Sequence, residues 1–324
     1  MKIGITTTVP VEVIYAAGHV PVDLNNLFIT AGSPQEYVDA AEREELPANV
    51  CAWVKGIYWA VRRADDIQTL VAVVQGDCSN THGLVELWQR RGKRVIPFSY
   101  PFGRDRELMT LEMKRFMGAF GANREAVDRV KVRLDRIRAK LQRLDEMTWR
   151  EGLVTGGENH LWLVSASDFN GDPDRFEREL DAFLALARLR PPTTPRIRLG
   201  YLGVPPIISD FFQVVEASGG TVVFNEMSRQ FAMLEPPADL LEQYLRYTYP
   251  YDVEGRLEDI RRQVRERGLR GLIHYVQSFC FRQMEHPILA RELPIPVLRI
   301  EGDRPGPMDG RTRTRLESFL EMLS

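Results

Sequence analysis

The alternation of short apolar runs with amphipathic segments is the feature that most limits how this chain can fold. Runs rich in Val and Ile and bounded by turn residues are typical of buried strands, and the first hundred residues hold three, at 2–10, 69–75 and 94–100. Between the first two, Val54, Ile57 and Val61 share one face of a predicted helix. Strands separated by helices predict a mostly parallel sheet with helices packed on it, which is the α/β class.

The same alternation returns in the last third of the chain. Four further strands are predicted at 196–203, 219–226, 269–276 and 296–303. Helical segments separate them near 207–218, 254–267 and 281–292. The sequence therefore predicts a second α/β unit with its own parallel sheet.

The middle of the chain is helical and ends in a stiff linker. A charged helical region runs from 104 to 146 with a break near 118–123, and a further helix begins after Asp172. The proline-rich stretch "RPPTTPR" at 190–196 is the best linker candidate. We therefore expect three parts: an N-terminal α/β domain (1–145), a helical connector with the linker (146–195) and a C-terminal α/β domain (196–324).

The composition argues against several classes of protein. The net charge of −2 and the pI of about 6.3 give no overall field that would attract nucleic acid or an anionic membrane. No apolar run is long enough to cross a bilayer, and the N-terminus lacks a signal-peptide pattern, so a cytoplasmic protein is expected. Three cysteines in such a chain do not indicate a disulfide framework.

Two of the three cysteines follow predicted strands directly. The strand in "TLVAVVQGDCSNTHG" leads into Cys78, and the strand in "LIHYVQSFCFRQMEH" leads into Cys280. Parallel α/β sheets bind ligands at the carboxyl ends of their strands. Cys51 falls in the first turn of a predicted helix, where backbone N–H groups favour a thiolate. Each cysteine alone is better explained as a buried small hydrophobe. The joint pattern instead favours ligands.

The residues alone do not decide which metal the cysteines would bind. A zinc ion needs a fourth ligand, which His82 or His274 could supply. A cubane iron–sulfur cluster held by three cysteines leaves one iron free to bind water or a substrate oxygen. The spacing of the cysteines does not separate these alternatives.

Three polar residues near the same sheet edge are candidates for catalysis. Thr8 and Glu12 follow the first strand, and Ser278 stands two residues before Cys280. These side chains could hydrogen-bond a substrate, although Thr8 is also placed to cap a helix that begins near Pro10. His160 lies in a predicted helix and is interpreted as a structural histidine.

Several motifs together resemble the 2-hydroxyacyl-CoA dehydratase / benzoyl-CoA reductase family, in particular its smaller D-component-type subunits. The resemblance covers nearly the whole chain. It rests on "GITTTVPVEVIYAAGHVPVDL", "ELPANVCAWVKG", "GDCSNTHGLVELW", "VVEASGGTVVFNE" and "PIPVLRIEGDRPGPMDGRTRTRLESFLEML". The three cysteines fall where that family places its cluster ligands.

The resemblance implies a fold, a cofactor and partners. It implies two flavodoxin-like domains with a [4Fe-4S] cluster in the cleft between them, held by Cys51, Cys78 and Cys280. It implies an anaerobic enzyme, a dehydratase-like lyase or a reductase acting on an acyl-CoA or related small molecule. The implied partners are an ATP-dependent activator with its own iron–sulfur cluster, which delivers one low-potential electron, and a homologous second subunit or a second copy of this chain.

The chain also departs from the better-known members. It lacks the longer N-terminal region that is common in the paired dehydratase subunits, which leaves the acyl-CoA substrate open. The alternatives are an electron-relay or double-cubane-type reductase component, or a metal-bearing scaffold without catalysis. Three cysteines anchor one cubane, so a double cubane would have to be shared across two chains.

Overall fold

The computed structural model describes residues 1–324 and contains two separate four-stranded sheets. The strands of the first sheet are β1 (Lys2–Ile5), β2 (Val20–Asp23), β3 (Ile67–Gln75) and β4 (Arg94–Ser99). Those of the second are β5 (Ile197–Gly203), β6 (Gly220–Asn225), β7 (Gly271–Val276) and β8 (Val297–Glu301). Every strand pair is parallel, and the orders are β2-β1-β3-β4 and β6-β5-β7-β8. The predicted fold class, two flavodoxin-like α/β units, is confirmed.

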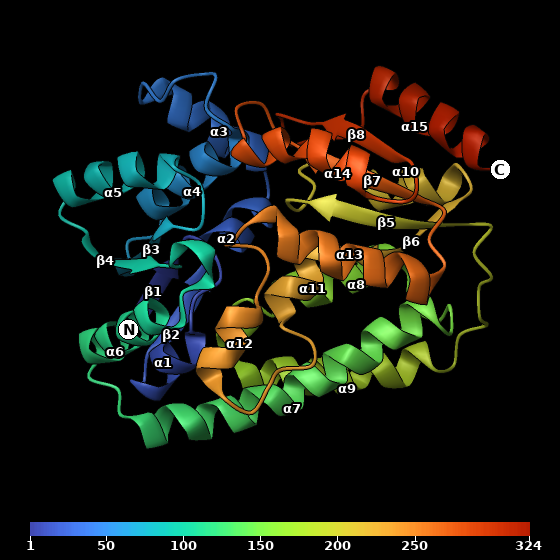
Figure 1. The fold of residues 1–324 in the computed structure, drawn as a ribbon. Helices are drawn as coiled ribbons and strands as arrows, with labels where there is room; N and C mark the ends of the chain where they lie inside the picture. The colour runs from blue at the N-terminus through green and yellow to red at the C-terminus, as the bar shows by residue number, and fades with distance from the viewer.

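Helices connect the strands and cover both sheets (Figure 1). In the first half they are α1 (Val11–Ala16), α2 (Leu24–Ile29), α3 (Pro34–Arg43), α4 (Ala52–Arg63) and α5 (Asn80–Arg90). The middle holds η1 (Phe102–Arg104), α6 (Arg106–Phe120), α7 (Arg124–Trp149), α8 (Gly156–Ser165), η2 (Phe169–Gly171) and α9 (Pro173–Ala187). The C-terminal part of the chain holds α10 (Phe211–Ala217), α11 (Glu226–Ala232), α12 (Leu240–Arg246), α13 (Val253–Arg267), η3 (Phe281–Glu285), α14 (His286–Glu292) and α15 (Gly310–Leu323).

All seven predicted strands are present, but the first is shorter than its apolar run. β1 ends at Ile5, and the threonines that follow leave the sheet. The sequence did not predict β2, which has only four residues and contains Pro21. Because β2 is an edge strand paired with β1 alone, the proline costs the sheet little. The helix expected near 207–218 begins only at Phe211, after a loop that contains Pro205 and Pro206.

The long helix α7 links the two sheets. Asn123 caps its start by accepting a hydrogen bond from the Ala126 N–H (2.8 Å). Its apolar face, which includes Leu134 and Leu141, is fully buried. Figure 1 shows α7 running beneath both halves of the molecule, and it contacts α1 near one end and β6 near the other.

The apolar cores also cross between the halves. The largest core joins Ile5 and Phe98 of the first sheet to Leu141 of α7 and Tyr244 of α12. A second core joins helices α2 and α4 to the second sheet, for example through Phe28 and Tyr275. The two sheets are therefore fixed relative to each other by shared side chains. The domain boundaries at 145 and 195 stay a prediction.

None of the helices combines the length and the apolar character that crossing a membrane requires.

Candidate functional site

One large cavity lies where the carboxyl ends of the two sheets meet. Its volume is about 1200 Å³. Segments that follow β1, β3, β5 and β7 all contribute to its wall, and α2 and α8 complete it. In each sheet the first and third strands lie at the centre, and the chain order reverses there. Parallel sheets bind ligands at such a reversal.

All three cysteines line this cavity, and for Cys78 and Cys280 this agrees with the expectation drawn from their positions after strands. Cys51 is the N-cap residue of α4, Cys78 lies between β3 and α5, and Cys280 is the residue before η3. The side chains are partly buried and carry free thiols. Their charges would influence one another, since Cys78 and Cys280 both raise the pKa of Cys51. Whether the three bind one group stays a prediction at this point.

The expectation of a stabilised thiolate at Cys51 is wrong for the protein without a bound metal. Burial raises the pKa of Cys51 to about 12 and that of Cys78 to about 11. Burial also raises the pKa of Cys280, which the nearby Arg282 guanidinium only partly offsets. Desolvation outweighs the hydrogen bonds from the first turn of α4. Such thiols release their protons when a metal binds and supplies the missing positive charge.

The two histidines considered as zinc ligands lie elsewhere. The His82 Nε2 atom is 2.7 Å from the Val74 carbonyl oxygen. His274 is fully buried, and its Nδ1 atom is 3.2 Å from Nδ1 of His286. Neither lines the cavity, and no group of three His, Cys, Asp or Glu side chains is gathered closely enough to hold a single ion. These histidines therefore give the zinc alternative no fourth ligand.

The loop before Cys280 carries backbone strain. Phe279 has a φ of 57°, a left-handed conformation that is rare for a bulky residue, and its side chain is 70% exposed. Arg282 follows, fully buried, with its guanidinium 4.7 Å from the centre of the Tyr249 ring and 4.5 Å from that of Phe281. It also donates to a carboxylate oxygen of Glu285 (2.7 Å). These contacts hold the strained loop in place.

The three catalytic candidates occupy different surroundings. Thr8 lines the cavity, and Pro10 rather than Thr8 occupies the N-cap position of α1. Glu12 is fully buried away from the cavity, where it accepts hydrogen bonds from Arg138 (2.7 Å), Gln243 and Tyr244. The Arg138 charge holds the pKa of Glu12 low despite a burial effect that acts in the opposite direction.

Ser278 also lies outside the cavity lining. Its hydroxyl donates to the Asp303 carboxylate (2.6 Å), which also accepts from the Ser278 N–H (2.6 Å). Of the three candidates, only Thr8 is in place to touch a ligand.

Sequence reasoning missed a pair of buried carboxyl groups in the cavity wall. Asp23 is the last residue of β2 and accepts hydrogen bonds from the Ser167 hydroxyl (2.6 Å) and from Asn25. Asp168 accepts from the Asp23 N–H (2.6 Å). Burial and the Asp23 charge raise the pKa of Asp168 to about 7, and burial raises that of Asp23. No cation pairs with either, so this pair can hold a proton at neutral pH.

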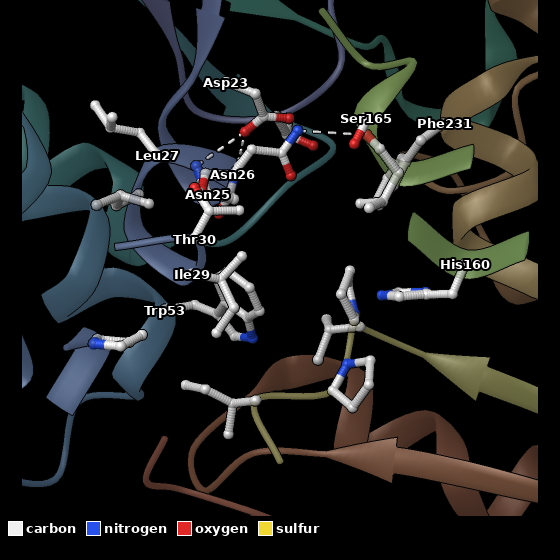
Figure 2. Close-up of a pocket in the computed structure, with 18 of the residues that line it drawn as sticks. Asp23, Asn25, Asn26, Leu27, Ile29, Thr30, Trp53, His160, Ser165 and Phe231 are labelled. Carbon is white, nitrogen blue, oxygen red and sulfur yellow. Dashed lines mark hydrogen bonds between the residues drawn. The ribbon is translucent and has the colours of Figure 1, made fainter. Parts of the chain in front are cut away.

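His160 faces the cavity from α8 and is buried and hydrogen-bonded there, which agrees with its interpretation as a structural histidine (Figure 2). Its Nδ1 atom is 2.7 Å from the Ser228 hydroxyl oxygen, and its ring lies 5.1 Å from that of Phe212. Burial lowers the pKa of His160 to about 4, so the ring is neutral at pH 7. Figure 2 shows Trp53 and Ile29 on the other side of the cavity.

Three buried N–H donors in the cavity wall, on Trp53, Gln277 and Arg282, have no hydrogen-bond partner. The Gln277 side-chain oxygen accepts from the Trp53 backbone N–H (3.5 Å), which leaves the Gln277 Nε2 group without an acceptor. The Gln277 side chain lies near the Tyr275 hydroxyl, where it partly offsets the burial that raises the pKa of that group, but the hydroxyl already donates to the Gly302 carbonyl oxygen and accepts from the Ile207 N–H. The Trp53 Nε1 group is likewise buried and unpaired. An acceptor atom of a bound ligand could pair with such donors.

The fold and the cavity define an α/β protein of two parallel sheets whose thiol-bearing strand ends share one ligand-binding cleft. The family model for 2-hydroxyglutaryl-CoA dehydratase, D-component, matches residues 6–323, so the chain belongs to that family. Membership makes it a dehydratase-type component and confirms the resemblance seen in the sequence. A search of curated proteins found no match.

Proposed function

We propose that this chain is the cytoplasmic iron–sulfur subunit of an activator-dependent dehydratase or reductase. It would hold a [4Fe-4S] cluster through Cys51, Cys78 and Cys280 and bind an acyl-CoA or related small molecule beside it. The observation that carries the proposal is that all three cysteines of the chain, from both halves, line one cavity at the strand ends.

The residues present fit such a group. Thiol sulfur is the ligand that iron–sulfur clusters require, and the cavity wall offers three thiols. The unpaired N–H donors of Gln277 and Trp53 would find acceptors in an electron-rich group. When bound, a three-cysteine cluster supplies a Lewis-acidic iron with an open position and a one-electron donor. An ATP-dependent activator with its own cluster would supply the electron, and a homologous subunit or second copy would complete the assembly.

The size of the cavity favours substrate binding by this chain over an electron relay alone. A cavity of about 1200 Å³ exceeds the range of about 300–1,000 Å³ that is usual for small-molecule sites. Its walls are largely apolar, with polar groups at a few places. Apolar walls would exclude water from a bound ligand, and the Asp23–Asp168 pair could hold a proton next to it.

Anaerobic purification with iron and acid-labile sulfide assays tests this proposal. We expect about four irons and about four sulfides per chain, as a cubane requires, and loss of both when Cys51, Cys78 or Cys280 is replaced by Ser. Met284→Ala is the matched control, because its side chain is 80% exposed and lies near Cys280 in the sequence. A protein that stays free of iron after anaerobic reconstitution, or Ser variants that keep full iron, would contradict the proposal.

A further inference from the structure

The charged side chains that line the cavity are mostly acidic. Only two are basic, Lys2 and Arg282. Six are carboxyl groups, those of Asp23, Asp77, Glu158, Asp168, Asp172 and Glu216. Such a lining differs from that of a site for an anion, which normally presents arginine or lysine.

Both basic side chains are already paired with acids of the chain, although the buried Nε–H of Arg282 has no hydrogen-bond partner. Lys2 Nζ is 2.6 Å from the Asp66 carboxylate, in an exposed pair at the edge of the first sheet. The Arg282 guanidinium is enclosed between two aromatic rings and donates to the Glu285 carboxylate and to the Tyr249 carbonyl oxygen. The positive charge of each is therefore already matched by an acid of the chain itself.

The acidic groups, by contrast, mostly lack a cation. Glu158 alone forms an ion pair, with Arg190 (2.8 Å). Asp77 accepts from the Tyr249 hydroxyl (3.1 Å), and Asp23 and Asp168 accept only from neutral donors. A carboxylate that entered the cavity would lose its hydration, gain no cation that is not already paired, and approach the acids that are ionised. A ligand without charge escapes all three penalties.

The rest of the lining suits an uncharged ligand. His160 is held by Ser228 and presents a neutral ring to the cavity. Asn26 adds a side-chain amide, and Trp53 adds an indole N–H without a partner. Between these polar groups lie Leu27, Ile29, Val204, Pro205 and Ile207. Apolar walls with isolated neutral hydrogen-bonding groups bind molecules with an apolar body and uncharged polar groups.

We infer that the part of the substrate that enters this cavity is uncharged: an acyl group with an apolar or amide side chain and no terminal carboxylate. The chain would therefore discriminate against the 2-hydroxyglutaryl group, which ends in a carboxylate and after which the family is named. This inference rests on the proposed function, because it specifies the acyl group for the same cavity.

Two thioesters of equal size test the charge preference. The CoA thioester of 2-hydroxyglutarate and that of its 5-carboxamide differ only in the terminal group, and their nucleotide charges cancel in the comparison. Binding of each to the anaerobically prepared protein is measured by titration calorimetry. We expect the carboxamide to bind at least about tenfold more tightly, because only the carboxylate must be desolvated without a partner. Equal affinity, or tighter binding of the dicarboxylate, overturns the inference.

Introducing a charge into the apolar wall of the cavity gives a second test of the charge preference. Ile29→Lys places a cation in the cavity and is expected to narrow or reverse the preference, whereas Ile29→Met changes shape without charge and should leave it. A preference that does not respond to Ile29→Lys also overturns the inference. Iron and sulfide assays on the same preparation test the proposed function separately. If neither thioester binds to protein that carries the cluster, the acyl assignment is wrong and this inference falls with it.

Discussion

Replacing Arg256 of α13 should strongly destabilise the protein. Its guanidinium is fully buried and makes two hydrogen bonds to the Glu226 carboxylate, at 2.7 and 2.8 Å. In Arg256→Met, Glu226 stays buried and keeps only the Gly203 N–H as a donor (3.2 Å). Removing one partner of a buried ion pair costs about 3–5 kcal/mol, because the remaining charge is uncompensated. Urea unfolding followed by circular dichroism measures this loss in the free energy of unfolding.

The double variant should lose less stability than the two single variants together. Arg256→Met with Glu226→Leu removes both charges of this pair and leaves Glu285, the second acid that contacts Arg256, paired with Arg282, so the loss should be at least about 2 kcal/mol smaller than the sum of the two single losses. Arg261→Met on the same helix breaks an exposed pair with Glu292 (2.9 Å) and should cost less than about 1 kcal/mol. The argument would be refuted by an Arg256→Met loss below about 1 kcal/mol, or by losses that simply add.

Three further predictions address the cavity and the helices around it. Because the pKa of His160 is lowered to about 4, the unfolded state binds the extra proton below pH 6.5, and stability should fall as the pH drops towards 4. His160→Gln should remove about 2.4 kcal/mol of that fall, measured as the difference between the free energies of unfolding at pH 7 and pH 4.5. An unchanged pH dependence would contradict this prediction. Gly56→Ala should lower the free energy of unfolding by about 1–3 kcal/mol, because the new Cβ would lie 2.4 Å from the Phe28 ring. Gly83→Ala adds its Cβ in open space and should cause no loss of stability. Equal effects of the two substitutions in thermal unfolding would refute this. Finally, Gln277→Leu should retain iron but make the cluster's reduction potential more negative in EPR-monitored titration, because a donor to the electron-rich group is lost; an unchanged potential would exclude that hydrogen bond.

The sequence predicted the parts of the fold that have long, continuous patterns. The buried strands β3 and β7 appear as apolar runs because both of their faces are covered. The edge strand β2 escaped prediction because four residues with a proline give no readable period. The short helices α11 and α12 are likewise placed by packing against the first half, which no local pattern reveals.

The site residues that directly follow a predicted strand could be predicted from the sequence. The ends of parallel strands meet at one edge, so Cys78 and Cys280 could be assigned to ligand-binding edges from their positions alone. The contact between Asp23 and Asp168 joins residues 145 positions apart through the docking of α8, and nothing in either neighbourhood indicates it. The protonation of Cys51 was mispredicted because the helix terminus is visible in sequence whereas desolvation is not.

The repeated topology of the two halves explains why the cavity carries three thiols. Cys78 follows β3 and Cys280 follows β7, so each comes after the third strand of its sheet. The helix before β3 begins at the N-cap residue Cys51, whereas the helix before β7 begins at Asp252. One half therefore contributes two thiols and the other contributes one. Two equivalent halves would offer an even number of thiols, whereas this cavity offers three, so the proposed four-iron group would keep one position without a protein thiol. That asymmetry is what the proposed function requires, because a group with one position free of protein ligands can bind a substrate.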